Sequence, residues 1–334
     1  MDVVSCPKAL PQSPTFYYST LLKIRLFVAM KVAISGATGL VGQRLVDRLH
    51  KSHDVVVFTR SEAKAQKVFP ASRYPNLKIV AYTPKTSGAW QDNISGCDAV
   101  VNLAGAPIAE QRWTASYKQE ILSSRQVGTE KIVEAIAKAT DKPKTLINAS
   151  AIGYYGTSET ATFDETSSLG NDFLAEVCQK WEAAAEKARE SGTRTVILRS
   201  GIVLAKEGGA LTKMLLAFNT FVGGPLGTGQ QWVSWIHRDD LVSLIETALQ
   251  SDAWQGIYNA TAPNPVTMQQ LSEALGSVIN RPSWLPVPGF VLELLLSDGA
   301  KVVLEGQKVL PSRTQTAGFK FGFSTVKEAL QDLL

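Results

Sequence analysis

Lys31-Val32-Ala33-Ile34-Ser35 leads directly into Gly36-Ala37-Thr38-Gly39-Leu40-Val41-Gly42, and this stretch decides the fold. The apolar run predicts a buried strand, and the residues from Leu40 onward predict a helix. Between them, Gly36 permits a sharp turn, Gly39 lets the backbone approach a pyrophosphate, and Gly42 lets the helix pack closely on the strand. The free N–H groups at a helix N-terminus attract anions. Residues 36–42 therefore predict a dinucleotide-binding loop.

The same alternation of short apolar runs and longer helical stretches continues along the chain. Further strands are predicted at Val55–Thr59, Leu77–Ala81, Ala99–Leu103, Thr145–Ala149 and Thr195–Leu198. Helices are predicted at Leu40–Lys51, Ser116–Thr140 and Asn171–Ser191. Continuous apolar runs are typical of strands covered on both faces. Strand–helix–strand repeats with right-handed crossovers predict an α/β fold with a doubly wound parallel sheet, a Rossmann fold.

The sequence changes character after Arg199, where glycines crowd the region 208–229 and prolines follow at 282–288. One more helix and strand are predicted at Asp239–Gln250 and Ile257–Asn259, and these return to the sheet. Further helices are predicted at Thr267–Asn280, Phe290–Leu296, Lys301–Leu310 and Thr325–Leu334. We therefore predict a dinucleotide-binding domain over 30–200 and about 236–262. A smaller, mostly helical substrate lobe would comprise about 201–235 and 263–334.

Composition excludes several classes of protein. The 34 basic and 30 acidic residues give a net charge of +4 with no basic run, so no nucleic-acid partner is expected. The three cysteines, Cys6, Cys97 and Cys178, are widely spaced and predict neither a disulfide framework nor a metal site. The most apolar windows, Leu21–Met30 and Phe290–Leu296, are shorter than a membrane span of about 20 residues.

The first 29 residues form a leader that carries Pro11 and Pro14 and no periodic pattern. Met30 directly precedes the first strand and is predicted to begin the fold. A disordered extension or an early start codon is the favoured interpretation, with a cytoplasmic protein as the consequence. An organelle-targeting peptide, with the chloroplast stroma as the compartment, is the alternative.

The end of the second strand indicates which dinucleotide binds. Sites that prefer NAD have an acidic residue there, but this strand ends in Thr59-Arg60. Since a guanidinium can pair with a 2′-phosphate, NADP(H) is the predicted cofactor. Small residues at Asn102–Pro107 would let the backbone pass beside the ribose and phosphates, although a helix-entry turn explains them equally well.

Taken together, these motifs resemble the extended short-chain dehydrogenase/reductase superfamily, in its atypical epimerase-family subgroup. The subgroup is variously labelled nucleoside-diphosphate-sugar epimerase-like or cell-division-inhibitor-like. The matching motifs are Gly36–Gly42, Asn102–Gly105, Arg112-Trp113, Lys118–Ile121, Ser124-Arg125, Gly153–Gly156, Lys180–Glu182, Arg199–Leu204, Gly223–Gly229, Trp235–Asp240 and Leu304–Pro311.

The resemblance implies roles for particular residues. Thr59 and Arg60 would hold the adenosine 2′-phosphate, and Leu103 and Ala104, with Gly105 after them, would line the dinucleotide. Glu120 and Arg125 would reach it from the helix after the fourth strand. For Arg125 there is an independent reason, because a cation there can meet the pyrophosphate.

The catalytic residues of the superfamily are missing from their usual place. The superfamily uses a tyrosine activated by a lysine four residues later, but those positions of the helix hold Leu174 and Cys178. We therefore predict that Ser150, at the end of the fifth strand, and Tyr154, in the loop after it, carry proton transfer. A capping serine and packing tyrosines, Tyr154 and Tyr155, remain the alternative.

Two functions follow from these observations. The first is an NADP(H)-dependent oxidoreductase or epimerase that acts on an unidentified small molecule, with nucleotide-sugars among the candidates, through a degenerate catalytic centre. The second is a non-catalytic NADP(H)-binding regulator, for example in cell or plastid division. The sequence leaves the oligomeric state open.

Overall fold

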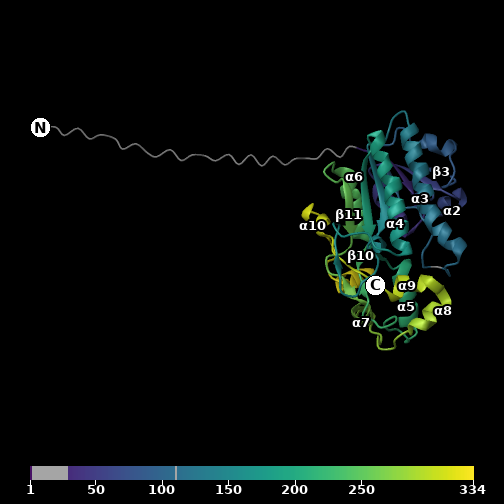
Figure 1. Cartoon of the computed structure of the whole chain (residues 1–334). Helices are drawn as coiled ribbons and strands as arrows, with labels where there is room; N and C mark the ends of the chain where they lie inside the picture. The colour runs from purple at the N-terminus through teal and green to yellow at the C-terminus, as the bar shows by residue number, and fades with distance from the viewer. Residues whose placement is uncertain (2–28, 110) are drawn as a thin grey trace.

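A seven-stranded parallel sheet lies at the centre of the computed structural model, which describes residue 1, residues 29–109 and residues 111–334 (Figure 1). Its strands are β1 (Lys31–Ser35), β2 (Asp54–Thr59), β3 (Leu77–Ala81), β4 (Ala99–Asn102), β5 (Thr145–Ala151), β7 (Arg194–Ser200) and β11 (Gly256–Ala260). Their spatial order is β11-β7-β5-β4-β1-β2-β3, and every neighbouring pair is parallel. The predicted Rossmann fold is confirmed.

The direction of winding reverses between β1 and β4, which pair with each other although β2 and β3 lie between them in sequence. The side chains of Ser35 and Asn102, at the carboxyl ends of these strands, meet in a 2.6 Å hydrogen bond. Ligands of open α/β sheets bind outside the carboxyl ends of the strands at such a reversal.

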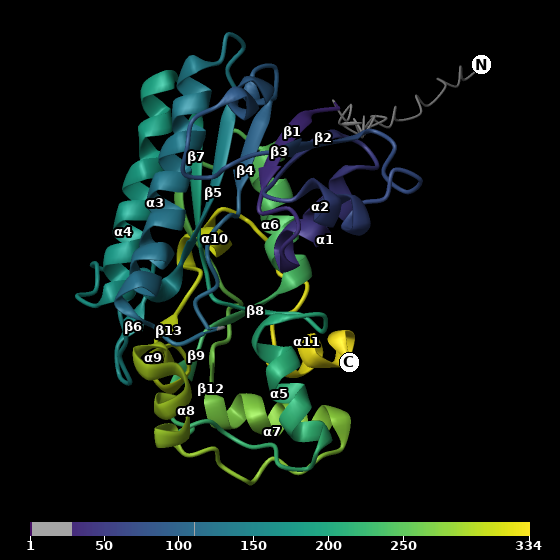
Figure 2. The same cartoon turned by 90° about the vertical axis from the view of Figure 1, so that its right-hand side faces the viewer.

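Helices cover both faces of the sheet because the strands are apolar on both sides. On one face, α1 (Leu40–Leu49) and α6 (Arg238–Gln250) pack against Val32 and Ile34 of β1. On the other, α3 (Ala115–Lys138) and the end of α4 (Phe173–Glu186) pack against a cluster that includes Ala33. Figure 2 shows α3 and α4 side by side on their face of the sheet. Shorter helical elements are α2 (Glu62–Val68), η1 (Ala89–Ile94), η2 (Ile152–Tyr155) and η3 (Lys187–Ser191).

A second lobe lies beyond the carboxyl ends of the strands (Figure 2). Its helices are α5 (Gly209–Asn219), α7 (Met268–Ile279), α8 (Gly289–Leu296), η4 (Ser297–Ala300), α9 (Lys301–Leu304) and α11 (Val326–Leu333), whereas α10 (Ser312–Thr316) packs against β11 of the central sheet (Figure 1). Two-stranded pairs complete the second lobe: β8 (Ile202–Leu204) with β10 (Trp235–His237), β9 (Trp232–Val233) with β12 (Val266–Thr267), and β6 (Thr162–Phe163) with β13 (Lys308–Val309). Its own core centres on Trp235, Phe218 and Leu275. The proposed residue boundaries between the two lobes stay a prediction.

Two predicted elements of this lobe differ from the structure. The helix expected over Lys301–Leu310 ends at Leu304. A Cβ on Gly306 would lie 2.0 Å from the Trp232 carbonyl oxygen, so this residue passes against backbone, and Lys308 then begins a strand. Conversely, helix α5 occupies a region interpreted as glycine-rich loop, because Gly208 and Gly209 lie at its N-terminus rather than in its interior.

Helix α6 is capped by the residue before it. The cap is His237 rather than either aspartate of the first turn, and its Nδ1 accepts a hydrogen bond from the Asp239 N–H at 3.1 Å. The Asp240 carboxylate instead accepts from the N–H groups of Gly322 and Phe323. It thereby ties the C-terminal segment to the first lobe.

The predicted leader over residues 1–29 lies almost entirely outside the described residues, which resume at Ala29. Within the described parts of the chain, every helix is too short or too polar to cross a bilayer.

Candidate functional site

The glycines of the loop between β1 and α1 are required by its geometry. Gly36 has a φ of +74°, and a Cβ there would lie 2.7 Å from the Leu103 carbonyl carbon. On Gly42, a Cβ would lie 2.4 Å from the Gly36 oxygen. Gly39 caps α1 without a side-chain hydrogen bond, and the first turn of α1 contains no acidic residue. The helix N-terminus is therefore left for an anion.

A cavity of about 730 Å³ opens beside this loop and extends between the two lobes. Gly36, Gly39, Leu40, Val41, Gly42 and Leu103 line its first-lobe end, as the dinucleotide prediction requires. Its far end is lined by residues of α3, α4 and the second lobe, among them Trp113, Lys118, Phe173, Trp232, Asp298, Val302 and Glu305. The cavity thus joins a phosphate-binding loop to a mixed apolar and charged chamber.

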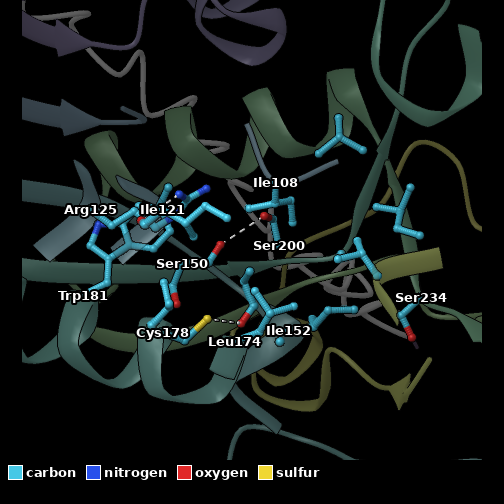
Figure 3. Close-up of a pocket in the computed structure, with 18 of the residues that line it drawn as sticks. Ile108, Ile121, Arg125, Ser150, Ile152, Leu174, Cys178, Trp181, Ser200 and Ser234 are labelled. Atoms are coloured by element: carbon cyan, nitrogen blue, oxygen red, sulfur yellow. Dashed lines mark hydrogen bonds between the residues drawn. The ribbon is translucent and has the colours of Figure 1, made fainter. Parts of the chain in front are cut away.

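Arg125, on α3, projects into this cavity beside the indole of Trp181 (Figure 3). Its guanidinium lies 5.2 Å from the Trp181 ring centroid, and a Cβ on Gly105 would lie 3.0 Å from its Cζ. It donates one hydrogen bond, to the Ile121 carbonyl oxygen at 3.1 Å, and among the described residues it has no carboxylate partner. Burial lowers the pKa of this guanidinium. A half-buried cation that lines a cavity without a counter-ion is well placed to meet an anionic ligand.

The residues predicted to select the 2′-phosphate lie at the end of β2. Thr59 is buried, and its hydroxyl bonds with the backbone of Ser61. Arg60 is exposed and makes neither a hydrogen bond nor an ion pair with the described residues. Neither residue lines the cavity, but Arg60 remains free to pair with a phosphate at the outer end of the loop.

Three other residues predicted to contact the cofactor do not line the cavity. Glu120 pairs with Lys85 at 2.6 Å on the outside of α3 and does not line the cavity, so the structure does not bring it to the site. Ala104 and Thr38 also lie beside rather than in the cavity lining, and the Thr38 carbonyl oxygen accepts from Gln43.

Ser150, at the end of β5, lines the cavity and connects it to a buried ion pair. Its hydroxyl donates to Glu182 Oε1 at 2.6 Å. Arg199 of β7 holds the same carboxylate with two bonds, Nε to Oε1 at 2.8 Å and Nη2 to Oε2 at 2.7 Å. The side chains of Arg199 and Glu182 are only 2% and 7% exposed. The three residues form one continuous polar network behind the cavity wall.

Tyr154, predicted to be the proton donor, does not line the cavity. The Arg199 guanidinium lies 3.3 Å from the centroid of its ring instead. The hydroxyl of Tyr155 accepts from Arg199 Nη1 at 3.1 Å and donates to Asn259 Oδ1. Burial raises the pKa of Tyr155 to about 12. Both tyrosines therefore support Arg199.

Two family models match the chain. One, described as the NAD dependent epimerase/dehydratase family, covers residues 32–260, and the other, described as a domain of unknown function (DUF1731), covers residues 287–333. The chain belongs to the NAD-dependent epimerase/dehydratase family.

Relatives within this epimerase family match almost the whole chain. The epimerase family protein SDR39U1 homolog, chloroplastic, of Arabidopsis thaliana is 47% identical over 98% of this chain and 93% of its own length. The epimerase family protein YfhF of Bacillus subtilis is 38% identical over 91% and 98%.

Solved structures agree with these relatives. The crystal structure of human epimerase family protein SDR39U1 (isoform 2) with NADPH has a TM-score of 0.80 and 33% identity, covering 91% of this chain and 99% of that one. UDP-N-acetylglucosamine 4-epimerase of Methanobrevibacter ruminantium M1, 17% identical with a TM-score of 0.73 over 91% and 97%, shows the shared fold.

Leu174 and Cys178 of α4 line the cavity where the tyrosine and lysine of the resembled superfamily were expected. Burial raises the pKa of the Cys178 thiol to about 12, so this cysteine is a neutral thiol at physiological pH. Leu174 has no ionisable group and Cys178 is a neutral thiol, so the two do not reproduce the tyrosine–lysine pair.

Sequence reasoning missed the charged residues that complete the site. Glu182 and Arg199 belong to motifs quoted for the resemblance, but their pairing across α4 and β7 has no local signal. Lys118 and Asp298 form an ion pair across the far end of the cavity, from α3 to η4. Of the two tryptophans that follow the Gly223–Gly229 motif, Trp232 lines the cavity and Trp235 is fully buried in the second lobe.

Proposed function

We propose that this chain is an NADP(H)-dependent oxidoreductase or epimerase that acts on a small molecule held between the two lobes. One observation carries the proposal: the phosphate loop and the uncompensated Arg125 guanidinium line the same cavity. An anionic dinucleotide fits both, because the loop offers free N–H groups and Arg125 offers an unpaired positive charge. The human relative crystallised with NADPH supports this assignment.

The dinucleotide would be held by residues 36–42, Leu103, Ala104, Gly105 and Arg125, with Thr59 and Arg60 at its 2′-phosphate. When bound, it would supply or accept a hydride. The chain's own part is to orient the substrate against the packed rings of Trp113 and Phe173, with the Lys118–Asp298 pair at the far end of the chamber. The substrate itself, with nucleotide-sugars among the candidates, is part of the proposal.

Cofactor binding tests the proposal first. Titration calorimetry is expected to show tighter binding of NADPH than of NADH. Arg60→Ala should weaken NADPH by about 5- to 150-fold, the loss of a charge-assisted bond of about 1–3 kcal/mol, and leave NADH nearly unchanged. Lys64→Ala, a neighbouring exposed cation, is the matched control. Equal affinity of the unaltered protein for both cofactors would contradict the assignment.

Turnover separates the catalytic proposal from the regulatory one. Purified protein with NADPH is mixed with a panel of nucleotide-sugars and carbonyl compounds, and absorbance of the reduced nicotinamide is followed. Oxidation of NADPH by any member supports an oxidoreductase. Because an epimerase restores its cofactor in each cycle and shows no net oxidation, parallel mixtures with NADP+ are analysed for isomerised sugars. Tight cofactor binding with neither change would instead favour the non-catalytic regulator in cell or plastid division.

The compartment belongs to the same proposal. The match to the Arabidopsis thaliana relative, whose name includes chloroplastic, spans 98% of this chain and therefore reaches into the leader. We accordingly favour the stroma over the cytoplasm. A fluorescent protein fused behind residues 1–29 is expected to enter plastids, whereas diffuse cytoplasmic fluorescence would restore the first prediction.

A further inference from the structure

We propose that Ser150 and Glu182 form a proton relay that replaces the missing tyrosine–lysine dyad, with Arg199 as its positioning residue. This inference rests on the proposed function, because a relay needs a redox reaction to serve. Four observations carry it: where Ser150 lies, which way its proton points, what holds Glu182, and what the neighbouring side chains cannot do.

Ser150 is the point where the network reaches the cavity. It lines the cavity, and its hydroxyl proton points away from it, toward Glu182 Oε1 at 2.6 Å. A serine hydroxyl has one proton and two lone pairs, so with the proton committed to Glu182 the lone pairs remain to accept a hydrogen bond. Ser150 is therefore arranged to receive a proton from the cavity side and to pass its own to the carboxylate.

Glu182 is held so that it can receive this proton repeatedly. Arg199 fixes both carboxylate oxygens, its Nη1 donates to the Tyr155 hydroxyl, and its guanidinium lies over the ring of Tyr154. The arrangement follows the logic of a catalytic triad, in which the proton-handling group is oriented by a third residue. A buried ion pair is a costly way to fasten a helix to a sheet, since apolar residues of similar volume would do so as well or better.

The neighbouring side chains leave no simpler route. The Cys178 thiol donates to the Ala151 carbonyl oxygen at 3.6 Å and has no carboxylate behind it, and Leu174 has no proton to give. Lys118 and Asp298 neutralise each other at the opposite end of the cavity, and Arg125 is a permanent cation. Among the described residues that line the central wall of β5 and α4, Ser150 is the hydroxyl with a carboxylate behind it.

The step balances as follows for oxidation of an alcohol. The substrate O–H bond breaks and its proton forms a new bond to Ser150 Oγ, while the proton of Ser150 passes to Glu182 Oε1. The carbon loses its hydride to the oxidised nicotinamide cofactor, which is thereby reduced. Reduction of a carbonyl compound reverses each transfer and starts from protonated Glu182, which takes its proton through Ser150 Oγ from water in the cavity before the substrate enters. After oxidation, the same path returns the proton of Glu182 to water once the product has left.

The first experiment requires no turnover. A short hydrogen bond to a carboxylate gives its proton a resolved, downfield NMR resonance, and we expect one that Ser150→Ala abolishes and Ser272→Ala keeps. Ser272 is a fully buried serine of α7 outside the cavity, which makes it the matched control. NADPH should slow exchange of this proton with D2O at least tenfold, because it fills the side from which exchange occurs. An exchange rate that NADPH does not alter would overturn the relay.

The second experiment measures turnover with NADPH and butane-2,3-dione as the probe. Ser150→Ala should lower kcat by about 100-fold or more, the usual effect of losing a positioned acid, with the Kd for NADPH unchanged. Unaltered protein should show a curved dependence of rate on the D2O fraction, because two protons move together. Full activity of Ser150→Ala, or a linear dependence, would overturn the relay alone. No oxidation of NADPH by this probe or any in the panel, together with no isomerised sugar in the mixtures with NADP+, would overturn the proposed redox function as well.

Discussion

At the scale of single residues, the three glycines of the phosphate loop have different tasks. Sequence reasoning assigned a turn to Gly36, cofactor approach to Gly39 and helix packing to Gly42. The structure agrees for Gly36, whose φ is +74°, and for Gly42, whose missing Cβ leaves room for the Gly36 oxygen. A Cβ on Gly39 would meet the Gly36 oxygen at 3.2 Å, a far milder contact.

These differences predict different outcomes for two substitutions. Gly42→Ala should destabilise the fold by about 1–3 kcal/mol, because its Cβ forces two backbone segments apart. Gly39→Val should leave a folded protein that no longer binds NADPH, because the side chain fills the place of the phosphate. Urea unfolding and titration calorimetry measure the two effects. A Gly39→Val protein with unchanged affinity would move the phosphate site away from this loop.

Ser150 and Tyr154 show the limit of prediction at this scale. Both lie at or just after the end of the fifth predicted strand, so their positions in the sequence make them equally good candidates for proton transfer. The structure separates them because Tyr154 lies over a guanidinium 45 residues later in the chain, Arg199, which no local pattern associates with it. The spacing and periodicity of residues in a sequence do not show which side chains meet over such a distance along the chain.

At the scale of elements, strands and helices of the sheet were predictable because both faces of every central strand are covered. Continuous apolar runs such as Val55–Thr59 then identify strands within a residue or two. The second lobe was harder, because its strands are two or three residues long and its glycines fit either loops or helix starts. Helix α5 was missed for this reason.

Helix α4 is fastened to the sheet by the Glu182–Arg199 pair, and stability measurements can isolate that contribution. Glu182→Leu should cost about 3–5 kcal/mol, because it leaves a buried guanidinium without its partner. The double variant Glu182→Leu/Arg199→Met should recover most of this loss, since no charge is then buried. Urea unfolding of both variants gives the comparison. Equal losses in the two proteins would show that the pair is not a coupled unit.

The start of α6 provides a pH-dependent test. Burial lowers the pKa of His237 below its ordinary value of 6.5, and its Nδ1 must stay unprotonated to cap the helix. The unfolded chain therefore binds this proton more readily, and stability falls as pH drops through 6.5. Charged neighbours also act on the imidazole of His237: three carboxylates favour its protonated form and one guanidinium opposes it, namely Asp239, Asp332, Asp240 and Arg238.

His237→Asn should keep the cap, because asparagine is a good N-cap residue, and remove this titration. The loss of unfolding free energy between pH 7.5 and 5.5 should therefore be smaller in the variant. The lowered pKa of His53 contributes a similar slope in both proteins, so only the difference reports on His237. Identical slopes would mean that His237 does not titrate in this range.

At the scale of the whole molecule, the two lobes are joined by more than the cavity. The chain leaves the sheet after β7, returns as α6 and β11, and leaves again. Asp240 binds the backbone at Gly322 and Phe323, and Arg313 donates to the carbonyl oxygens of Gln255 and Ile257. The sequence predicted the return to the sheet but not these bonds, which join segments about 60 to 80 residues apart.

Such interlocking predicts that the lobes unfold together. Native-state hydrogen exchange should give the same opening free energy for amides of β1, in the first lobe, and α7, in the second. NADPH at 100 times its Kd should raise the opening free energy of both sets of amides by about 2.7 kcal/mol. The cofactor would contact the loop of the first lobe inside a cavity that the second lobe also lines, so opening of either lobe would release it. An increase confined to β1 would show that the second lobe opens independently and that the cofactor does not depend on it.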